Sequence, residues 1–464
     1  MRNDFFENGR QVNGVKLRVA TCLVLLAMLS SACGQDKDRG CTADSKAGAP
    51  STTAPASVDP TDDLIASPEP GWPQWRGPRR DGISDEKGLL QKWPEDGPKL
   101  LWSKDDLGTG WCSPIVVGDQ IFITGDVGDD LVIYCFDTAG KLIWKTKNGK
   151  SWTGSYPGSR ACCVFSEGRI YQLGAHGRLA CLRASDGKEI WAFNILERFD
   201  AKNIRWALGE CLLVDGPRLI VSPGGKKAIV AALDKNSGKI VWTTPPLENA
   251  VEDEHAGHAS PILFRYAGRR VLAHCTSAHG LGIDADSGKV LWTVPLENRF
   301  GTNVSTPIYG YGQVYYVTPY SELGRAYRLV ADDGGINAEH MWTNPLDTVT
   351  GSGILIGKQF FSSGYSRIKY WCLVDWSSGQ TLQKLKDLTT GAAIMADGRV
   401  YCQDEKGNVA LLKHTPEGME IVSRFRLPIG PKKVRDAWAH PVLCDGRLYL
   451  RYHDGFWCHD VKRR

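Results

Sequence analysis

The stretch AIVAALDKNSGKIVW, residues 228–242, holds the pattern that decides the fold. An apolar run is followed by Asp234, a short polar turn that ends in Gly238, and Trp242 four positions after the Gly. An Asp side chain can accept hydrogen bonds from the backbone of its turn, and Gly adopts the positive φ that a tight turn requires. The pattern predicts two antiparallel strands joined by a turn, with Trp242 as a large apolar surface for packing.

Six further copies of this pattern occur along the chain. Those at 131–144, 178–191 and 280–292 are close, the copy at 328–342 is looser, and those at 370–383 and 408–422 replace the Trp by Gln383 and Val422. A second pattern alternates with the first and consists of apolar residues, a turn that contains Gly, and an alternating strand. It occurs eight times, at 113–123, 162–173, 211–221, 260–275, 306–317, 353–363, 392–403 and 440–451.

Two hairpin patterns per repeat give four strands, and the Trp positions lie 39 to 51 residues apart. Four-stranded units of this length are typical of β-propeller blades. LLWSKD (100–105) supplies a Trp strand without a preceding partner, and GFWCHDV (455–461) supplies the missing partner. We therefore predict an all-β, eight-bladed β-propeller over residues 98–464, closed by strands from both termini. The Trp residues expected to pack between blades are Trp102, Trp144, Trp191, Trp242, Trp292 and Trp342.

The first 97 residues have a different character. Basic residues precede an apolar run from Val19 to Leu29, and small residues then precede Cys33, so residues 1–33 are predicted to be an export signal. Cys33 is a candidate for lipidation; the alternative is a simple cleaved signal. Residues 34–71 are rich in Ser, Thr, Ala, Pro and Asp and predict a disordered tether. Residues 72–97 form an N-terminal extension ahead of the ring.

The repeats resemble the pyrroloquinoline quinone (PQQ) repeat family, over residues 98–464. That family includes quinoprotein alcohol dehydrogenases and the outer-membrane assembly lipoprotein BamB, so the resemblance implies a fold more strongly than a function. GWPQWRGPRRDG (71–82) also resembles a segment of exported proteins with such propellers. The resemblance implies that the loops from each Trp strand to the next blade lie on one face, around the mouth of the channel.

These mouth loops and the adjoining strand starts carry aromatic, basic and acidic residues. The candidates for a ligand or partner face are Arg160, Arg205, Trp206, Glu210, His255, His258, Asn303, Trp438 and His440, and the same loops carry Trp111, Trp152 and Tyr156. Side chains of these types, converging from separate loops, suit a polar ligand or a partner peptide. The alternative is that they only fill the entrance of a wide channel.

The resemblance also raises a cofactor hypothesis. PQQ dehydrogenases carry adjacent cysteines near the cofactor and bind Ca²⁺ through Glu, Asn and Asp. Cys162 and Cys163 are adjacent here, although they lie at the start of a hairpin pattern, where two buried side chains are the alternative. Glu210 and Asn303 match the Ca²⁺ ligands by loop position, but the catalytic Asp has no clear counterpart and the chain is shorter than those enzymes. His255 and His258 are a further candidate metal site; the alternative is that they lie on a solvated loop.

Three functions follow as hypotheses. We favour a noncatalytic binding scaffold similar to BamB, monomeric, on the periplasmic side or the outer membrane, held by a lipid anchor and bound to envelope proteins. The alternatives are a PQQ- and Ca²⁺-dependent alcohol or sugar dehydrogenase and a propeller that binds a glycan or another small molecule. Lys and Arg total 56 against 52 for Asp and Glu, a balance that argues against nucleic-acid binding. No catalytic residue is assigned.

Overall fold

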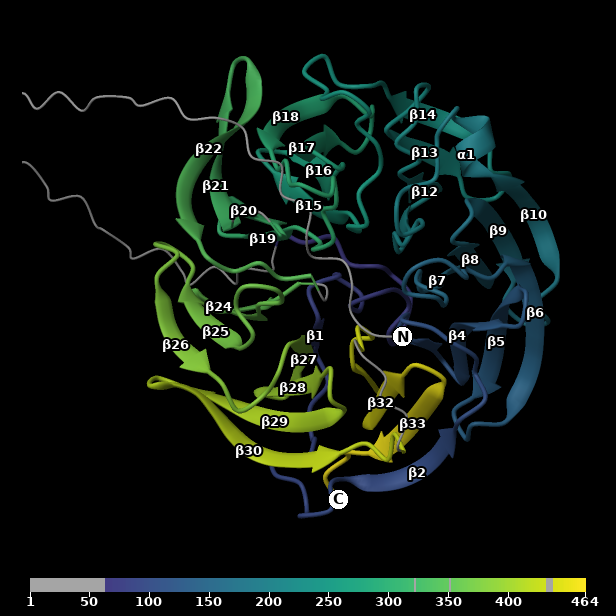
Figure 1. Ribbon diagram of the computed structural model, residues 1–464, viewed down its shortest axis with the longest axis vertical. Coiled ribbons are helices and arrows are strands. Elements are labelled where there is room, and N and C mark those ends of the chain that lie inside the picture. The colour runs from purple at the N-terminus through teal and green to yellow at the C-terminus, as the bar shows by residue number, and fades with distance from the viewer. Residues whose placement is uncertain (1–62, 321–322, 350–351, 431–436) are drawn as a thin grey trace, which may run out of the picture. The chain divides into compact units, whose positions relative to one another are not determined.

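The ring of blades is the main feature of the computed structural model, which describes residues 63–320, 323–349, 352–430 and 437–464. In these residues eight sheets follow one another around a central axis as an eight-bladed β-propeller (Figure 1). The predicted all-β fold is confirmed. Within the described ranges α1 (Ile195–Arg198) is the single helix, and no helix there is long and apolar enough to cross a membrane.

Each blade has four antiparallel strands, numbered from the channel outward. Blade 1 contains β3 (Ile115–Val117), β4 (Gln120–Val127), β5 (Asp130–Asp137) and β6 (Leu142–Lys150); blade 2 contains β7 (Val164–Ser166), β8 (Arg169–Leu173), β9 (Arg178–Arg183) and β10 (Glu189–Asn194). Blade 3 contains β11 (Leu213–Asp215), β12 (Arg218–Val221), β13 (Val230–Asp234) and β14 (Ile240–Thr244); blade 4 contains β15 (Ile262–Tyr266), β16 (Arg269–Cys275), β17 (His279–Asp284) and β18 (Val290–Pro295).

The second half of the ring repeats this order. Blade 5 contains β19 (Ile308–Gly310), β20 (Gln313–Thr318), β21 (Leu323–Asp332) and β22 (Gly335–Asn344); blade 6 contains β23 (Ile354–Ile356), β24 (Gln359–Ser363), β25 (Trp371–Asp375) and β26 (Thr381–Leu385). Blade 7 contains β27 (Gly391–Ala396), β28 (Arg399–Asp404), β29 (Asn408–Thr415) and β30 (Gly418–Arg426), with β1 (Ile83–Ser84) beside β27. Blade 8 contains β31 (Val442–Cys444), β32 (Arg447–Tyr452), β33 (Gly455–Asp460) and β2 (Lys99–Lys104).

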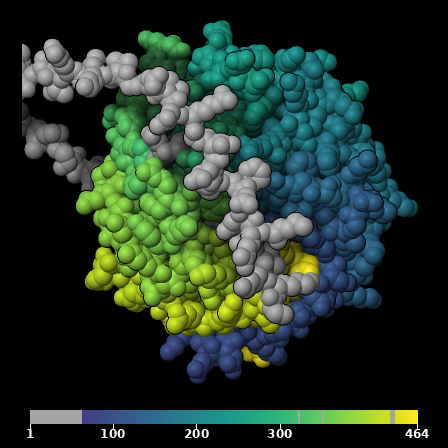
Figure 2. All heavy atoms as spheres, in the orientation of Figure 1, coloured from purple at the N-terminus to yellow at the C-terminus, as the bar shows by residue number. Residues whose placement is uncertain are grey.

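Blade 8 closes the ring with strands from both ends of the chain, as the sequence predicted. β2 pairs antiparallel with β33 and places Trp102 opposite Cys458. In Figure 2 the blades follow one another in order of colour, and the yellow C-terminal blade meets the blue N-terminal strand. Each blade keeps two sheet edges, the inner strand at the channel and the outer strand at the rim, and the closed ring leaves these edges short and protected.

Neighbouring blades are joined by the repeated Trp. The indole N–H of Trp242 in β14 donates to the carbonyl oxygen of Ala285 in blade 4, at 3.1 Å, and the ring covers Gly288. Gly288 has φ +77°, and a Cβ at this position would lie 2.4 Å from Trp242 Cε3. The same bond to the turn of the next blade is made by Trp102 with Thr138, Trp144 with Ala184, Trp191 with Lys235 and Trp342 with Trp376. The turn pattern and the Trp therefore form one contact shared between two blades.

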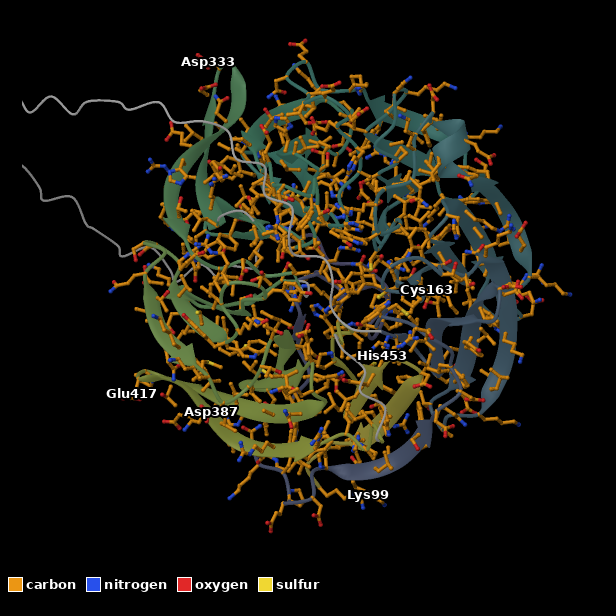
Figure 3. The ribbon with its side chains drawn as sticks, in the orientation of Figure 1. Lys99, Cys163, Asp333, Asp387, Glu417 and His453 are labelled. Atoms are coloured by element: carbon orange, nitrogen blue, oxygen red, sulfur yellow. The ribbon has the colours of Figure 1, made fainter. Side chains whose placement is uncertain are left out.

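Trp292 makes a different contact. Its indole N–H lies 3.3 Å from the hydroxyl oxygen of Tyr316 in blade 5, in place of a turn carbonyl. The reason is the length of β21 and β22, ten residues each, which carries their turn at Asp332–Gly335 outward (Figure 3, label Asp333). This explains why the sequence pattern at 328–342 is looser than its neighbours.

The N-terminal segment, defined as residues 63–97, passes through the middle of the ring (Figure 1, purple). It bonds to or pairs with residues of all eight blades. The contacts are Trp72 with Val116, Pro73 with Phe165, Arg80 with Cys211, Ile65 with Leu263, Asp63 with Tyr309, Arg76 with Ser352, Ile83 with Met395 and Leu90 with Val461. The segment is therefore part of the core, and it plugs the channel.

The N-terminal segment, which we also call the plug, enters and leaves the channel on the face opposite the mouth loops. Leu64 pairs with Phe264 in the middle of β15, and the carbonyl oxygen of Asp63 accepts from Arg265 N nearer the end of that strand. β1 runs parallel to β27 toward the end of β27. Residues 63–71, which we expected within the tether, pack against the ring because Leu64 and Ile65 contact apolar side chains of blades 4 and 3. The signal, Cys33 and the rest of the tether lie outside the described residues.

Candidate functional site

The mouth loops enclose a pocket above the plug, with a volume of about 150 Å³. Its lining is mostly aromatic and apolar. The residues are Trp75, Trp111, Cys112, Tyr156, Arg160, Cys162, Trp206, Gly209, Cys211, His258, Ser260, Thr302, Val304, Tyr320, Val349, Trp438 and His440. Trp75 comes from the N-terminal segment and meets the ring of His440 edge-on at 5.2 Å, so the plug supplies one wall of the pocket.

Two groups of aromatic side chains lie at the mouth. Trp111 and Trp438 stack with their ring centroids 4.5 Å apart, and Tyr156 lies 5.3 Å from Trp438. Figure 3 labels His453 in the turn between β32 and β33, whose ring contacts Trp111 at 4.6 Å. On the other side Trp206 packs against Phe300 and Tyr320. Tyr156 and Trp206 meet at 6.4 Å and connect the two groups.

Arg160 is the cation of the pocket, and most of its guanidinium N–H groups already donate to backbone carbonyl oxygens. The guanidinium donates to the carbonyl oxygens of Gly158 at 2.6 Å and Tyr156 at 2.5 Å, and more weakly to that of Ser155. Burial lowers the pKa of Arg160 to about 10, and the nearby Asp126 opposes this shift. Arg160 therefore shapes the loop that presents Tyr156 and remains charged at neutral pH.

His258 stays neutral in the pocket. Burial lowers the pKa of His258 to about 3, and the electrostatic effects of Arg160 and His255 act in the same direction. Asp126, which accepts the backbone N–H of Trp152 at 2.9 Å, has its pKa raised to about 6 by burial. The pocket thus combines a large aromatic surface with one internally bonded cation and neutral polar groups.

A belt of hydrogen bonds runs round the channel below the aromatic groups. The backbone N–H of His440 donates to Ser113 Oγ, that of Ser113 to Cys162 Sγ, and that of Cys162 to Cys211 Sγ. The belt continues from Cys211 N to Ser260 Oγ and from Ser260 N to Thr306 Oγ1. Each member starts one blade, and the spacings between 113, 162, 211 and 260 are all 49 residues.

Comparison with known proteins now gives the family. Residues 128–373, more than half of the chain, match the family described as "Outer membrane protein assembly factor BamB". The chain belongs to this family. BamB of Yersinia pestis is 22% identical over 335 residues, which cover 68% of this chain and 76% of that protein. BamB of Moraxella catarrhalis has a similar structure, with a TM-score of 0.55 at 15% identity, covering 79% of this chain and 98% of that one.

Quinoprotein dehydrogenases are similar over a shorter stretch. The quinohemoprotein alcohol dehydrogenase ADH-IIG of Pseudomonas putida is 29% identical over 216 residues, 43% of this chain and 29% of that enzyme. The quinoprotein ethanol dehydrogenase of Pseudomonas aeruginosa is 26% identical over 152 residues, 31% of this chain and 24% of that enzyme. The chain thus spans less than a third of the length of these enzymes.

The structure brings five of the nine candidate residues together. Arg160, Trp206, His258, Trp438 and His440 line the pocket. The other four do not line it: Arg205 packs outside, over Trp206 and Phe300, while Glu210, His255 and Asn303 bond within the protein. Glu254, next to His255, bonds instead to His279, and the described residues hold no group of three or more His, Cys, Asp or Glu side chains placed to bind a metal.

The residues proposed for PQQ and Ca²⁺ do not fit that role in this member of the BamB family. Both carboxylate oxygens of Glu210 accept bonds from Ser222, at 2.9 Å from the backbone N and 2.8 Å from Oγ. Burial raises the pKa of Glu210 to about 8, despite those bonds. Asn303 is fully buried and donates to the carbonyl oxygens of Thr276 and Leu296. Neither side chain presents oxygen ligands to the pocket, and we derive no step through this cofactor.

Sequence reasoning missed three parts of the site: Trp75, the belt and Tyr320. Trp75 lies in GWPQWRGPRRDG, a segment that has no repeat to fix its position in the ring. The belt did leave a signal, since residues 113, 162, 211, 260 and 306 each begin a copy of the second hairpin pattern. Tyr320, in blade 5, carried no such signal.

Proposed function

We propose that this protein is an exported scaffold, tethered to a membrane, whose mouth pocket binds an apolar or aromatic side chain of an envelope protein. The observation that carries the proposal is the pocket itself, lined by Trp75, Trp111, Trp206 and Trp438 among others. Aromatic side chains with a few polar neighbours are typical of the central pockets of protein interfaces. Membership of the BamB family supports an envelope role.

The size and charge of the pocket favour a side chain as occupant. A dry cavity of about 150 Å³ is known to accept a molecule the size of benzene. Arg160 donates to three backbone carbonyls, so it offers little to an anionic ligand. His258 is neutral at physiological pH because of its lowered pKa. An aromatic ring carried by a peptide matches this lining better than a phosphate or a carboxylate does.

The N-terminal segment reaches the ring from the face opposite the mouth, where Asp63 bonds to Tyr309. A lipid anchor at Cys33 would be joined to the ring through this segment.

Calorimetric titration of N-acetyl-L-tryptophanamide into the purified protein tests the pocket. We expect weak binding that Trp438→Ala abolishes and that Arg205→Ala, a change beside the mouth but outside the pocket, preserves. Binding that survives Trp438→Ala would contradict the proposed pocket. Heat from an oligosaccharide series alone would replace the peptide by a glycan, and binding of PQQ with Ca²⁺ that is lost in Glu210→Ala would support the dehydrogenase alternative.

Crosslinking in the cell tests the partner class. A photoreactive phenylalanine at Tyr156, 39% exposed at the mouth, is compared with the same residue at Leu382, 47% exposed on the outer edge of blade 6. We expect a light-dependent protein adduct from position 156 that Trp438→Ala removes. Equal adducts from both positions would indicate nonspecific contact and contradict the proposal.

A further inference from the structure

Cys162 and Cys211 lie side by side although 49 residues separate them. They hold the same belt position in blades 2 and 3, and the backbone N–H of Cys162 donates to Cys211 Sγ at 3.3 Å. Since an N–Cα bond is about 1.46 Å long, Cys211 Sγ lies within about 4.8 Å of Cys162 Cα. This proximity places the two sulfurs in the range from which a disulfide can form.

Cys163, the neighbour of Cys162 in sequence, has different surroundings. Its side chain packs in an apolar cluster between blades 1 and 2, with Ile115, Phe122 and Cys135, whereas Cys162 belongs to another cluster (Figure 3, label Cys163). Successive side chains of an extended chain point to opposite sides. The structure therefore pairs Cys162 with Cys211 of the next blade and leaves Cys163 in the core.

Both sulfur-bearing residues line the mouth pocket. Cys162 is 1% exposed and Cys211 is 6% exposed, and the pocket is the route by which solvent reaches them. The other cysteines of the described chain are also buried thiols. Cys112 lines the pocket as well, but its sulfur is bonded to Thr124 and Arg451, whereas those at the repeated strand position, such as Cys181 and Cys372, lie outside the pocket. The pair is thus reached by small reagents that enter the mouth.

Arg80 of the plug makes the two thiols of this pair differ in pKa. Arg80 donates to the carbonyl oxygen of Cys211 at 2.7 Å and places its charge beside the thiol. Burial alone would raise the pKa of Cys211, but the bonds from Cys162 and the charge of Arg80 outweigh it and lower that pKa, whereas the pKa of Cys162 is raised. Cys211 is then the nucleophile and Cys162 the resolving thiol, because the thiolate is the attacking form.

We propose that Cys162 and Cys211 form a reversible disulfide that joins blades 2 and 3 in the wall of the mouth pocket. The oxidant is a small disulfide such as oxidised glutathione. The Cys211 thiolate attacks one of its sulfurs, the S–S bond breaks, and one glutathione leaves. Cys162 loses its proton and attacks Cys211 Sγ, which releases the second glutathione. Two protein thiols are oxidised, and one disulfide is reduced to two thiols.

Peptide mapping of the intact protein tests this assignment. Reduced protein is incubated with oxidised glutathione, alkylated, and digested with trypsin without reductant. We expect the peptide 161–169, alkylated at Cys163, linked to the peptide 206–218, lighter by two hydrogens than the sum of these two peptides. Dithiothreitol should separate the two peptides again. The link should persist in Cys163→Ser and be absent in Cys162→Ser.

Three outcomes would overturn the proposal. The first is full alkylation of Cys162 and Cys211 after oxidation, and the second is a bond between Cys162 and Cys163 within one peptide. The third is glutathione that remains on Cys211 without a cross-link. All three are read on the unsubstituted protein, so the result does not depend on whether the serine variants fold.

Discussion

The guanidinium of Arg76 donates to the carbonyl oxygen of Ser352, 276 residues further along the chain, at 2.9 Å. A second bond reaches Gly353 at 2.7 Å, so one side chain of the plug binds the start of blade 6. Arg76 is 2% exposed, and burial lowers its pKa to about 10. The pairing of β2 with β33 therefore closes the ring, and the N-terminal segment links its blades along the axis.

Arg76→Met is expected to destabilise the protein by about 3 kcal/mol or more, because it removes charged hydrogen bonds and leaves buried carbonyl groups unsatisfied. Urea unfolding measures the change. Arg424→Met, at an exposed position of β30, is the matched control and should change the free energy of unfolding by less than about 0.5 kcal/mol. Equal effects of both changes would contradict the central role of the plug.

Ala substitutions at two glycines distinguish the stability cost of backbone strain from that of the contact between blades. Gly288 and Gly268 have nearly equal φ values, +77° and +76°, but only Gly288 lies against Trp242. Both Ala variants have the same strain of positive φ. Gly288→Ala should therefore cost about 1–3 kcal/mol more than Gly268→Ala in the free energy of unfolding, because its methyl group overpacks the indole. The same loss of stability in both variants would show that the contact is unimportant.

The repeated Trp residues should differ in their effect. Trp242 is 9% exposed, whereas Trp191 in the corresponding place of blade 2 is half-buried. Trp242→Ala is expected to lower the free energy of unfolding by about 3–5 kcal/mol through the cavity that it leaves. Trp191→Ala should cost less, since water already reaches part of that ring. Thermal and urea melts give the order, and a larger loss for Trp191 would be inconsistent with the contact described.

His274 makes stability depend on pH. It is 2% exposed, neither ring nitrogen has a hydrogen-bond partner within the described residues, and burial lowers its pKa from 6.5 to about 3, with Arg80 adding to the shift. Below pH 6.5 the unfolded chain takes up a proton that the folded chain does not bind, so stability decreases as pH falls toward 3. Between pH 7 and pH 5 this contribution is about 2 kcal/mol.

Replacing His274 removes that contribution. Urea unfolding at pH 7 and pH 5 should show that the free energy of unfolding falls less at pH 5 in His274→Leu than in the unsubstituted protein. His340→Leu, at an exposed position of β22, is the control for the exchange of a histidine for a leucine. An unchanged pH dependence in His274→Leu would argue that His274 is protonated in the folded protein.

Much of the candidate site was predictable from the repeats. Each mouth loop connects a Trp strand to the next blade, and the family resemblance implies that these loops, with Arg160, Trp206, His258 and Trp438, lie on one face. It assigns Glu210 and Asn303 to the same face, but these two side chains bond within the protein, to Ser222 and to backbone carbonyl groups. Loop position predicts the neighbourhood of a residue, whereas the direction of its side chain depends on partners from other strands.

The blades, their number and the closure of the ring were predictable from the amino-acid pattern. These features rest on local signals, namely Asp and Gly in tight turns, alternating apolar residues and a Trp at a regular distance. By contrast, the entry of Trp75, Arg76 and Arg80 into the channel and the contact of Cys162 with Cys211 depend on tertiary packing. The plug has no repeat, so its register comes from contacts that join residues hundreds of positions apart. The two cysteines become neighbours only because the geometry of the closed ring brings equivalent positions of adjacent blades together around its narrow axis.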